Sequence, residues 1–331
     1  MCGRTACVLE GPVLSRACEY RDASQKRRQV AWQSEKTAGM TYRPSFNVSP
    51  GGVVACLVSG AHFKTAPERV LQAMIWKMIP SWHKGDIGAL KLSTHNCRLE
   101  TATTTKVFSP ALKNGNRCVV VCSGYYEWKT TVLQGKKQAS KQPYFIYAPQ
   151  PEYVKINEPS SWAKDEWSEE NGWQGAKLLK LAGIFNTSTD EDGTIVHSCS
   201  VLTMEANHVL SWMHSRVPAF LETEENVNAW LDFENVSLNE ALAQLHSPSK
   251  KSLQWHPVGR AVGNSRCNEA DCIKPINLKK SNHVREKSGP TGLMASWLKK
   301  EPTGSDKKQS TLRTRNFDEK SERNTKRIKT E

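Results

Sequence analysis

The chain has 331 residues, of which 46 are Lys or Arg and 33 are Asp or Glu, so its net charge is +13. A basic excess of this size favours a polyanionic partner, with nucleic acid as the first candidate. No run approaches the roughly 18 apolar residues of a membrane span, and the start lacks the charged and then apolar pattern of a secretory signal. The ten cysteines are therefore expected to be reduced thiols in a cytosolic or nuclear protein.

Apolar runs and turn residues alternate up to about residue 276, and β-branched and aromatic residues dominate the runs. The predicted strands with the clearest signal span residues 117–128, 143–149, 178–185 and 198–206. Three segments have helical periodicity instead, at residues 100–114, 223–233 and 238–246. Many strands and few helices predict an α+β, mainly β fold, a single domain over residues 2–276 built on a curled, barrel-like sheet.

Two segments depart from this pattern. Residues 150–175 are polar and acidic and contain three tryptophans, which predicts a long surface insertion. Residues 277–331 are rich in Lys, Ser, Thr and Arg and poor in apolar residues, the composition of a disordered tail. Fifteen basic and seven acidic residues lie between Lys279 and Glu331, so +8 of the net charge of +13 belongs to the tail.

Two short sequences stand out within this tail. Residues 292–300 (GLMASWLKK) form an amphipathic island around Trp297, and such an island in a disordered region is typical of a docking motif that folds on a partner. The basic sequence KRIK at residues 326–329 has the character of a nuclear import signal. A nuclear location is therefore expected.

The second residue of the chain is a cysteine, and a small residue at this position allows an aminopeptidase to remove Met1. The mature chain then begins with Cys2, which carries an α-amine and a thiol on neighbouring carbons. Their ordinary pKa values, about 8 and about 8.5, leave both nucleophiles partly available near neutral pH. The spacing of the other cysteines does not match a common zinc site, so neither a metal nor another cofactor is expected.

Three further stretches combine polar or charged side chains with residues that favour turns. In HNCRLET, Asn96, Arg98 and Glu100 alternate, so all three share one face if the segment is an extended strand. In SGYYEWK, Glu127 ends an apolar strand beside aromatic residues, and in MHSRVPAF a histidine and an arginine alternate in the same way. A surface acid or a structural histidine would fit these patterns equally well, because one sequence does not show whether the groups meet in space.

Taken together, seven motifs resemble those of the SRAP (SOS response-associated peptidase) family and occur in the family's order: MCGR, FNVSPG, WKMIPSW, NCRLET, GYYEWK, HSRVPAFL and WHPVGRAVGN. They span residues 2 to about 276, nearly the whole predicted domain. The sequence departs from the family pattern at Lys77, Cys97 and Ser215, and none of these positions is one of the proposed catalytic side chains.

The resemblance implies a protein that binds single-stranded DNA, traps abasic sites covalently through its N-terminal cysteine and protects the genome during replication. The implied catalytic residues are Cys2, Asn96, Glu127 and His214. The implied DNA contacts are Arg4, Asn47, Trp82, Arg98, Trp128, Arg216 and Pro218. Among these, Trp128 would wedge against the bases beside the lesion. The family name further implies self-removal of Met1, and a tail motif in a related member implies docking of a replication clamp around Trp297. We expect a monomer that acts at replication forks.

The implied chemistry depends on the two nucleophiles of one residue. An abasic deoxyribose opens to an aldehyde, which the α-amine of Cys2 attacks with loss of water to give an imine. The thiolate then closes on the imine carbon and forms a five-membered thiazolidine. These steps move protons repeatedly, so they need acid–base groups held in place. Glu127 is expected to relay protons, His214 to protonate the sugar ring oxygen, and Asn96 to orient the amine or the sugar.

Three other functions remain open at this point. Cys2, His214 and Asn96 could form a thiol peptidase or an N-terminal nucleophile amidohydrolase, which would turn over amides without DNA. A non-covalent reader of modified DNA bases would use the basic surface and leave Cys2 incidental. A scaffold recruited through residues 292–300 is compatible with any of these functions.

Overall fold

The computed structural model describes residues 3–278 except 65–66, 84, 132–138 and 163–166. Cys2 and the predicted tail with Trp297 lie outside the described residues. The described residues belong to one compact unit that ends at Leu278. Among their helices, none combines the length and the apolar character that crossing a bilayer requires.

Five strands close into a barrel. They are β8 (Val53–Ser59), β9 (Arg69–Trp76), β11 (Arg117–Cys122), β14 (Leu179–Thr189) and β15 (Ile195–Glu205). Antiparallel pairing joins β9 to β8, β8 to β11, β11 to β14 and β14 to β15, and a parallel pairing of β15 with β9 completes the ring. The Sγ atoms of Cys56 and Cys199 lie 3.8 Å apart although β8 and β15 are not neighbours, so these side chains meet inside the barrel. The predicted α+β, mainly β, barrel-like fold is confirmed.

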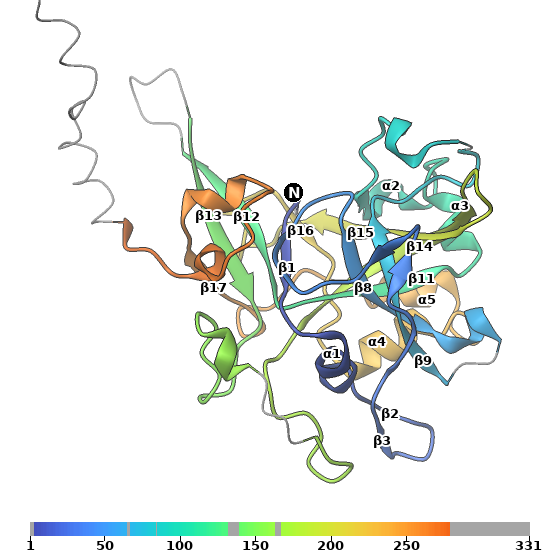
Figure 1. Cartoon of the computed structure of the whole chain (residues 1–331), viewed down its shortest axis with the longest axis horizontal. Coiled ribbons are helices and arrows are strands. Elements are labelled where there is room, and N and C mark those ends of the chain that lie inside the picture. Colours follow the sequence, from blue (N-terminus) through green and yellow to red (C-terminus); the bar gives the residue numbers. More distant parts are fainter. Residues whose placement is uncertain (1–2, 65–66, 84, 132–138, 163–166, 279–331) are drawn as a thin grey trace, which may run out of the picture. The chain divides into compact units, whose positions relative to one another are not determined.

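A second sheet of five strands lies beside the barrel (Figure 1). Its strands, in spatial order, are β17 (Gln254–Pro257), β13 (Ser140–Tyr147), β12 (Gly124–Thr131), β1 (Thr5–Cys7) and β7 (Ser45–Val48). Only Ser123 separates β11 of the barrel from β12 of this sheet, and its backbone N–H donates to the Ala6 carbonyl of β1. The predicted strand over residues 117–128 is therefore two strands that belong to different sheets.

The remaining elements are short and cover or flank the two sheets. The strands are β2 (Tyr20–Arg21), β3 (Arg27–Arg28), β4 (Ala31–Ser34), β5 (Lys36–Thr37), β6 (Met40–Thr41), β10 (Asn96–Arg98) and β16 (Arg216–Pro218). The α-helices are α1 (Gly11–Ala17), α2 (Leu99–Ala102), α3 (Ser109–Lys113), α4 (Glu224–Leu231) and α5 (Leu238–Ala243). The 3₁₀ helices are η1 (Gly60–Phe63), η2 (Ile87–Ala89), η3 (Pro159–Ser161), η4 (Arg260–Gly263) and η5 (Ala270–Ile273).

The helix predictions are confirmed at α4 and α5 and need correction at residues 100–114. Capping boxes begin both confirmed helices, Thr223 with Asn226 in α4 and Ser237 with Glu240 in α5. The third predicted helix consists of α2 and α3 instead, separated by a run of three threonines and three further residues. β-Branched residues have low helix propensity, and Pro110 favours a new helix start, which accounts for the break.

The segment predicted as a surface insertion, residues 150–175, is anchored in the core. In its described part the only helical element is η3. The side chain of Trp162 is 1% exposed and its indole donates to the Lys155 carbonyl, while Val154 is 5% exposed. The segment is therefore not confined to the surface, and the polar composition of its other residues hides this apolar anchor from a reading of the sequence.

Candidate functional site

Glu127 is a buried carboxylate in the middle of the second sheet. Its side chain is 5% exposed, and its Oε1 accepts a hydrogen bond from the Trp128 backbone N–H at 3.1 Å. It lies on β12 directly opposite Tyr144 of β13. Because side chains alternate along a strand, Trp128 faces the other side of the sheet, where it packs half-buried against the core.

The start of the described chain runs along the same strand. The Tyr126 N–H donates to the Arg4 carbonyl at 2.9 Å, and Thr5 lies opposite Tyr125. Continuing this antiparallel register by one residue beyond Arg4 places Gly3 opposite Glu127. The described chain therefore begins at the level of the buried carboxylate.

Arg4 and Asn47, both predicted as DNA contacts, form an internal clamp. The Arg4 guanidinium donates to Asn47 Oδ1 at 3.0 Å and to the carbonyls of Val262 and Gly263, each at 3.1 Å. Asn47 is 4% exposed, and its Nδ2 lies 2.7 Å from the Cys267 carbonyl and within 3.2 Å of two further carbonyls. These bonds join the first strand to the chain around η4, and they use the polar atoms that the sequence assigned to DNA.

We expect Asn47→Ala to lower the free energy of unfolding by about 2–3 kcal/mol, since the Arg4 guanidinium and several carbonyls would lose a buried partner. The measurement is the midpoint of urea unfolding. Asn235→Ala is the matched control, because Asn235 is exposed and, among the described residues, its side chain bonds only to the Asp232 carboxylate. Equal midpoints for the two variants would contradict a structural role for Asn47.

Asn96 and Arg98 lie on β10, which pairs in parallel with Val201–Thr203 of the barrel strand β15. Asn96 is opposite Val201 and Arg98 is opposite Thr203. Cys97 between them is fully buried, whereas Arg98 is exposed to solvent. The predicted common face therefore holds for Asn96 and Arg98. It does not extend as a strand to Glu100, because β10 ends at Arg98 and α2 begins at Leu99.

Glu100 is paired with Arg216 rather than with Arg98. The Arg216 guanidinium donates to both Glu100 carboxylate oxygens, at 2.6 and 2.8 Å, and to the Thr203 carbonyl at 2.5 Å. Thr203 of β15 lies between β10 and β16, so the ion pair crosses over this strand. Hydrogen bonding from Arg216 lowers the pKa of Glu100. The pair therefore adds stability above the ordinary carboxyl pKa, and this stability is lost as the pH falls through the lowered value.

His214 has a defined ring orientation. Its Nδ1 accepts a hydrogen bond from the Arg216 backbone N–H at 2.9 Å, so the neutral ring carries its proton on Nε2. His214 lies in the turn before β16, and its neighbours in sequence pack against the second sheet: the Trp212 ring contacts the Tyr144 ring with centroids 5.2 Å apart. Tyr144 is the cross-strand partner of Glu127, so the His214 turn covers the face of the sheet that carries Glu127.

The last two predicted DNA contacts differ in exposure. Trp82 is 56% exposed in the loop after β9, which leaves its ring available for stacking. Pro218 is buried on β16 opposite Thr203. The strand pairings thus bring together Glu127 and Tyr144 on the second sheet, and Asn96, Arg98 and Arg216 around β15.

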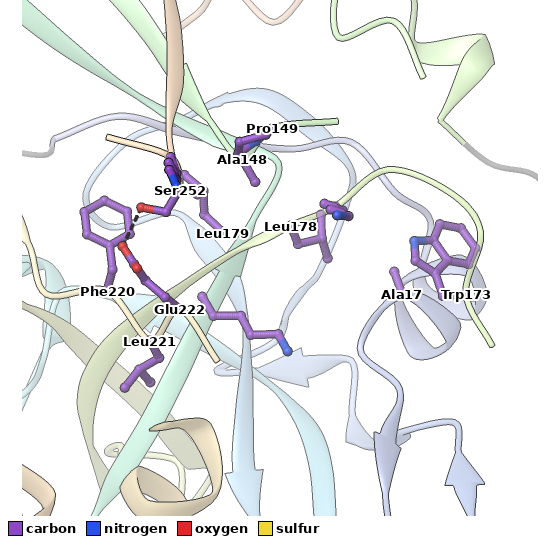
Figure 2. A pocket seen from close by; sticks show the side chains of 13 residues that line it. Ala17, Ala148, Pro149, Trp173, Leu178, Leu179, Phe220, Leu221, Glu222 and Ser252 are labelled. Atoms are coloured by element: carbon purple, nitrogen blue, oxygen red, sulfur yellow. Dashed lines mark hydrogen bonds between the residues drawn. The ribbon is translucent and has the colours of Figure 1, made fainter. Parts of the chain in front are cut away.

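A cavity of about 420 Å³ lies elsewhere, between α1, β14 and the chain before β17 (Figure 2). Trp173, Phe220 and Glu222 line it, and Ser252 donates to the Glu222 carboxylate across it. Of the described residues that were predicted to be catalytic or to bind DNA, none lines this cavity. It is therefore separate from the candidate site.

A family model decides where the chain belongs. The model described as SOS response associated peptidase (SRAP) matches residues 1–265. The chain belongs to the SRAP family. It is 37% identical over 319 residues to the "Abasic site processing protein HMCES" of Rattus norvegicus, covering 94% of this chain and 87% of that protein. The protein of the same name from Gallus gallus is 36% identical over 318 residues, covering 94% and 89%.

Solved structures resemble this fold at low sequence identity. A crystal structure of a protein from Bacteroides thetaiotaomicron has a TM-score of 0.57 at 19% identity and covers 83% of this chain and 100% of that one. One from Bordetella bronchiseptica has a TM-score of 0.54 at 16% identity and covers 78% and 100%. These likenesses show that the SRAP chain has the architecture of those proteins.

Some contributors to the SRAP site carry no signal in the sequence. Thr203 supports Arg216 through its carbonyl and through its hydroxyl at 3.4 Å, but it sits in an ordinary strand sequence. Only the pairing of β15 with both β10 and β16 places it between the two motifs. Asn47 is visible in the sequence as part of FNVSPG, yet its anchoring role depends on carbonyls more than 200 residues away.

Proposed function

We propose that this protein traps abasic sites in single-stranded DNA as a covalent thiazolidine formed by Cys2 after removal of Met1. Relatives that share most of this chain are named abasic site processing proteins. The observation that carries the proposal is the buried carboxylate of Glu127, with Gly3 opposite it in the extended register of β1 and β12. A buried acid beside the tether of the N-terminal residue supplies a proton relay where the amine would react.

The other side chains have complementary roles in this proposal. His214 presents its Nε2–H as a hydrogen-bond donor, since its Nδ1 accepts from the Arg216 N–H. A donor of this kind suits the sugar ring oxygen, whose protonation opens the hemiacetal to the aldehyde. Asn96, held on β10, offers an amide that can donate to one partner and accept from the other.

DNA binding would depend on exposed cationic and aromatic groups. Arg98 and Trp82 are exposed and suit contacts with phosphate and with an unpaired base. Arg216 is bound to Glu100 and 17% exposed, so we assign it mainly to holding the His214 turn in place. Arg4 and Asn47 contribute by anchoring the N-terminal strand.

The wider role we propose is protection of abasic sites at replication forks in the nucleus, by a monomer that docks a replication clamp through the tail around Trp297. The basic KRIK sequence and the amphipathic island at residues 292–300 support this part of the proposal. We further propose that the site removes Met1 itself, since the same acid–base groups would lie beside the first peptide bond.

The experiment that tests the proposal is a denaturing gel of the purified protein with a single-stranded oligonucleotide that carries one abasic site. A heat-stable shifted band is expected with this oligonucleotide and absent with one that lacks the lesion. Intact mass should show removal of Met1 and an adduct equal to protein plus DNA minus one water. A folded, Met1-free sample that gives no band would reject covalent trapping and favour the hydrolase or the non-covalent reader.

A further inference from the structure

Three aromatic side chains and one lysine outside the catalytic set form a cluster against the second sheet. The Trp212 ring contacts Tyr144 edge to face with centroids 5.2 Å apart, and it contacts Trp255 with centroids 6.0 Å apart. The Lys129 ammonium lies 4.9 Å from the centroid of the Trp212 ring. The indole Nε1–H donates to the Val209 carbonyl at 3.0 Å, which holds the ring in one orientation.

The strand register places this cluster on the same face as Glu127. Lys129 follows Glu127 by two residues on β12, and Tyr144 is directly opposite Glu127 on β13. Trp255 is opposite Ile146, which shares a face with Tyr144. The four side chains therefore continue outward from the buried carboxylate across one surface of the sheet.

Exposure and charge distinguish this cluster from ordinary core packing. Trp212 is 37% exposed, although it is fixed by a hydrogen bond and by neighbours on three strands. A fixed and partly exposed indole with a cation beside it has the composition of a surface that stacks bases and neutralises phosphates. Asn207, in the same loop as Trp212, donates to the Pro248 carbonyl at 2.8 Å and so joins this loop to the segment with the exposed Lys250 and Lys251.

We propose that Trp212, supported by Tyr144 and flanked by Lys129, is a second stacking platform, which binds an undamaged base of single-stranded DNA a short distance from the lesion. The proposal rests on the proposed function in one respect, the entry of DNA over the Glu127 face. The contact is non-covalent and independent of base identity, because every base offers an aromatic face.

The test is the affinity for an undamaged single-stranded oligonucleotide, measured by fluorescence anisotropy at one stated salt concentration. Base–aromatic stacking is worth about 1–3 kcal/mol, so Trp212→Leu should weaken binding on the order of tenfold. Trp212→Phe retains a ring and should recover most of the affinity. Tyr153→Leu is the matched control, since Tyr153 is 43% exposed and lies in the 150–175 segment, and it should bind like the wild type.

Lys129→Gln provides a variant that leaves the aromatic rings intact. It should reduce the slope of log affinity against log salt by about 1, as expected for the loss of one phosphate contact. Melting temperatures of all variants identify any loss of folding. If Trp212→Leu is folded and binds like Tyr153→Leu, or if Lys129→Gln has the wild-type salt slope, the platform is rejected.

The abasic oligonucleotide separates this proposal from the proposed function. If the wild type crosslinks the lesion and Trp212→Leu binds undamaged DNA normally, the platform is wrong and covalent trapping stands. If neither the wild type nor the variant crosslinks the lesion but Trp212→Leu still loses about tenfold in affinity, the stacking platform is supported and covalent trapping is wrong. A 2-aminopurine base walked along the strand should be quenched at one distance from the lesion with the wild type and not with Trp212→Leu, and equal fluorescence with the two proteins at every position would overturn the platform.

Discussion

Replacement of Cys2 by Ala is expected to reduce the heat-stable adduct with an abasic oligonucleotide to background. The α-amine of the new N-terminal alanine can still form an imine, but without a thiolate no ring closes and the imine hydrolyses on heating. Borohydride should therefore restore a band with Cys2→Ala, because it reduces the imine to a stable amine. The measurement is a pair of denaturing gels, with and without the reductant.

An insertion of Ala between Met1 and Cys2 is the matched control for this variant. It keeps the thiol and a free α-amine but places them on different residues, so it too should lose the heat-stable adduct. The other cysteines are not expected to replace Cys2: of the nine in the described residues, eight are buried, and burial raises the pKa of Cys7 to about 11 and of Cys97 to about 12. A heat-stable adduct at wild-type yield in either variant would exclude the thiazolidine mechanism.

Glu127→Gln is the second change with a large expected effect. The amide has nearly the shape of the carboxylate and retains an oxygen for the Trp128 N–H, but it cannot accept and return a proton. General acid–base catalysis contributes about 10²–10⁴-fold to a rate, so we expect crosslinking to slow by about 10²-fold or more. The measurement is the single-turnover rate of adduct formation at saturating protein.

Affinity and stability serve as controls for Glu127→Gln. Binding to an undamaged oligonucleotide should equal that of the wild type, because the 5% exposed carboxylate offers almost no surface to a passing strand. Glu152→Gln, in the 150–175 segment, is a matched substitution of an exposed glutamate and should leave the crosslinking rate unchanged. If Glu127→Gln crosslinks as fast as Glu152→Gln, the assignment of the proton relay is wrong.

The motif around Glu127 predicts a strand but not the burial of this carboxylate. The apolar run in SGYYEWK predicted that Glu127 ends a strand beside aromatic residues. In the structure β12 continues to Thr131, with β1 on one edge and β13 on the other, so Glu127 is buried and Trp128 faces the opposite side. Burial of one strand residue depends on what packs on its face, and here that is a loop more than 80 residues later in the chain.

The arginines likewise differ in the structure although their motifs predict the same role for them. Arg4, Arg98 and Arg216 look alike in the motifs, and the resemblance to the SRAP family implied that all three contact DNA. The structure leaves Arg98 exposed, binds Arg4 to Asn47 and the chain around η4, and binds Arg216 to Glu100. An arginine donates to whichever acceptors the tertiary fold brings near it, so the sequence around the arginine does not determine its role.

The sequence by itself determined the fold class, the helices α4 and α5 and membership of the SRAP family, because periodicity, capping residues and ordered motifs are local properties of the chain. The tertiary structure alone decided which strands close the barrel, where β11 ends and β12 begins, and which partner each polar side chain has. Those outcomes depend on contacts between segments far apart in sequence, such as β9 with β15 and Asn47 with Cys267, for which no local pattern exists.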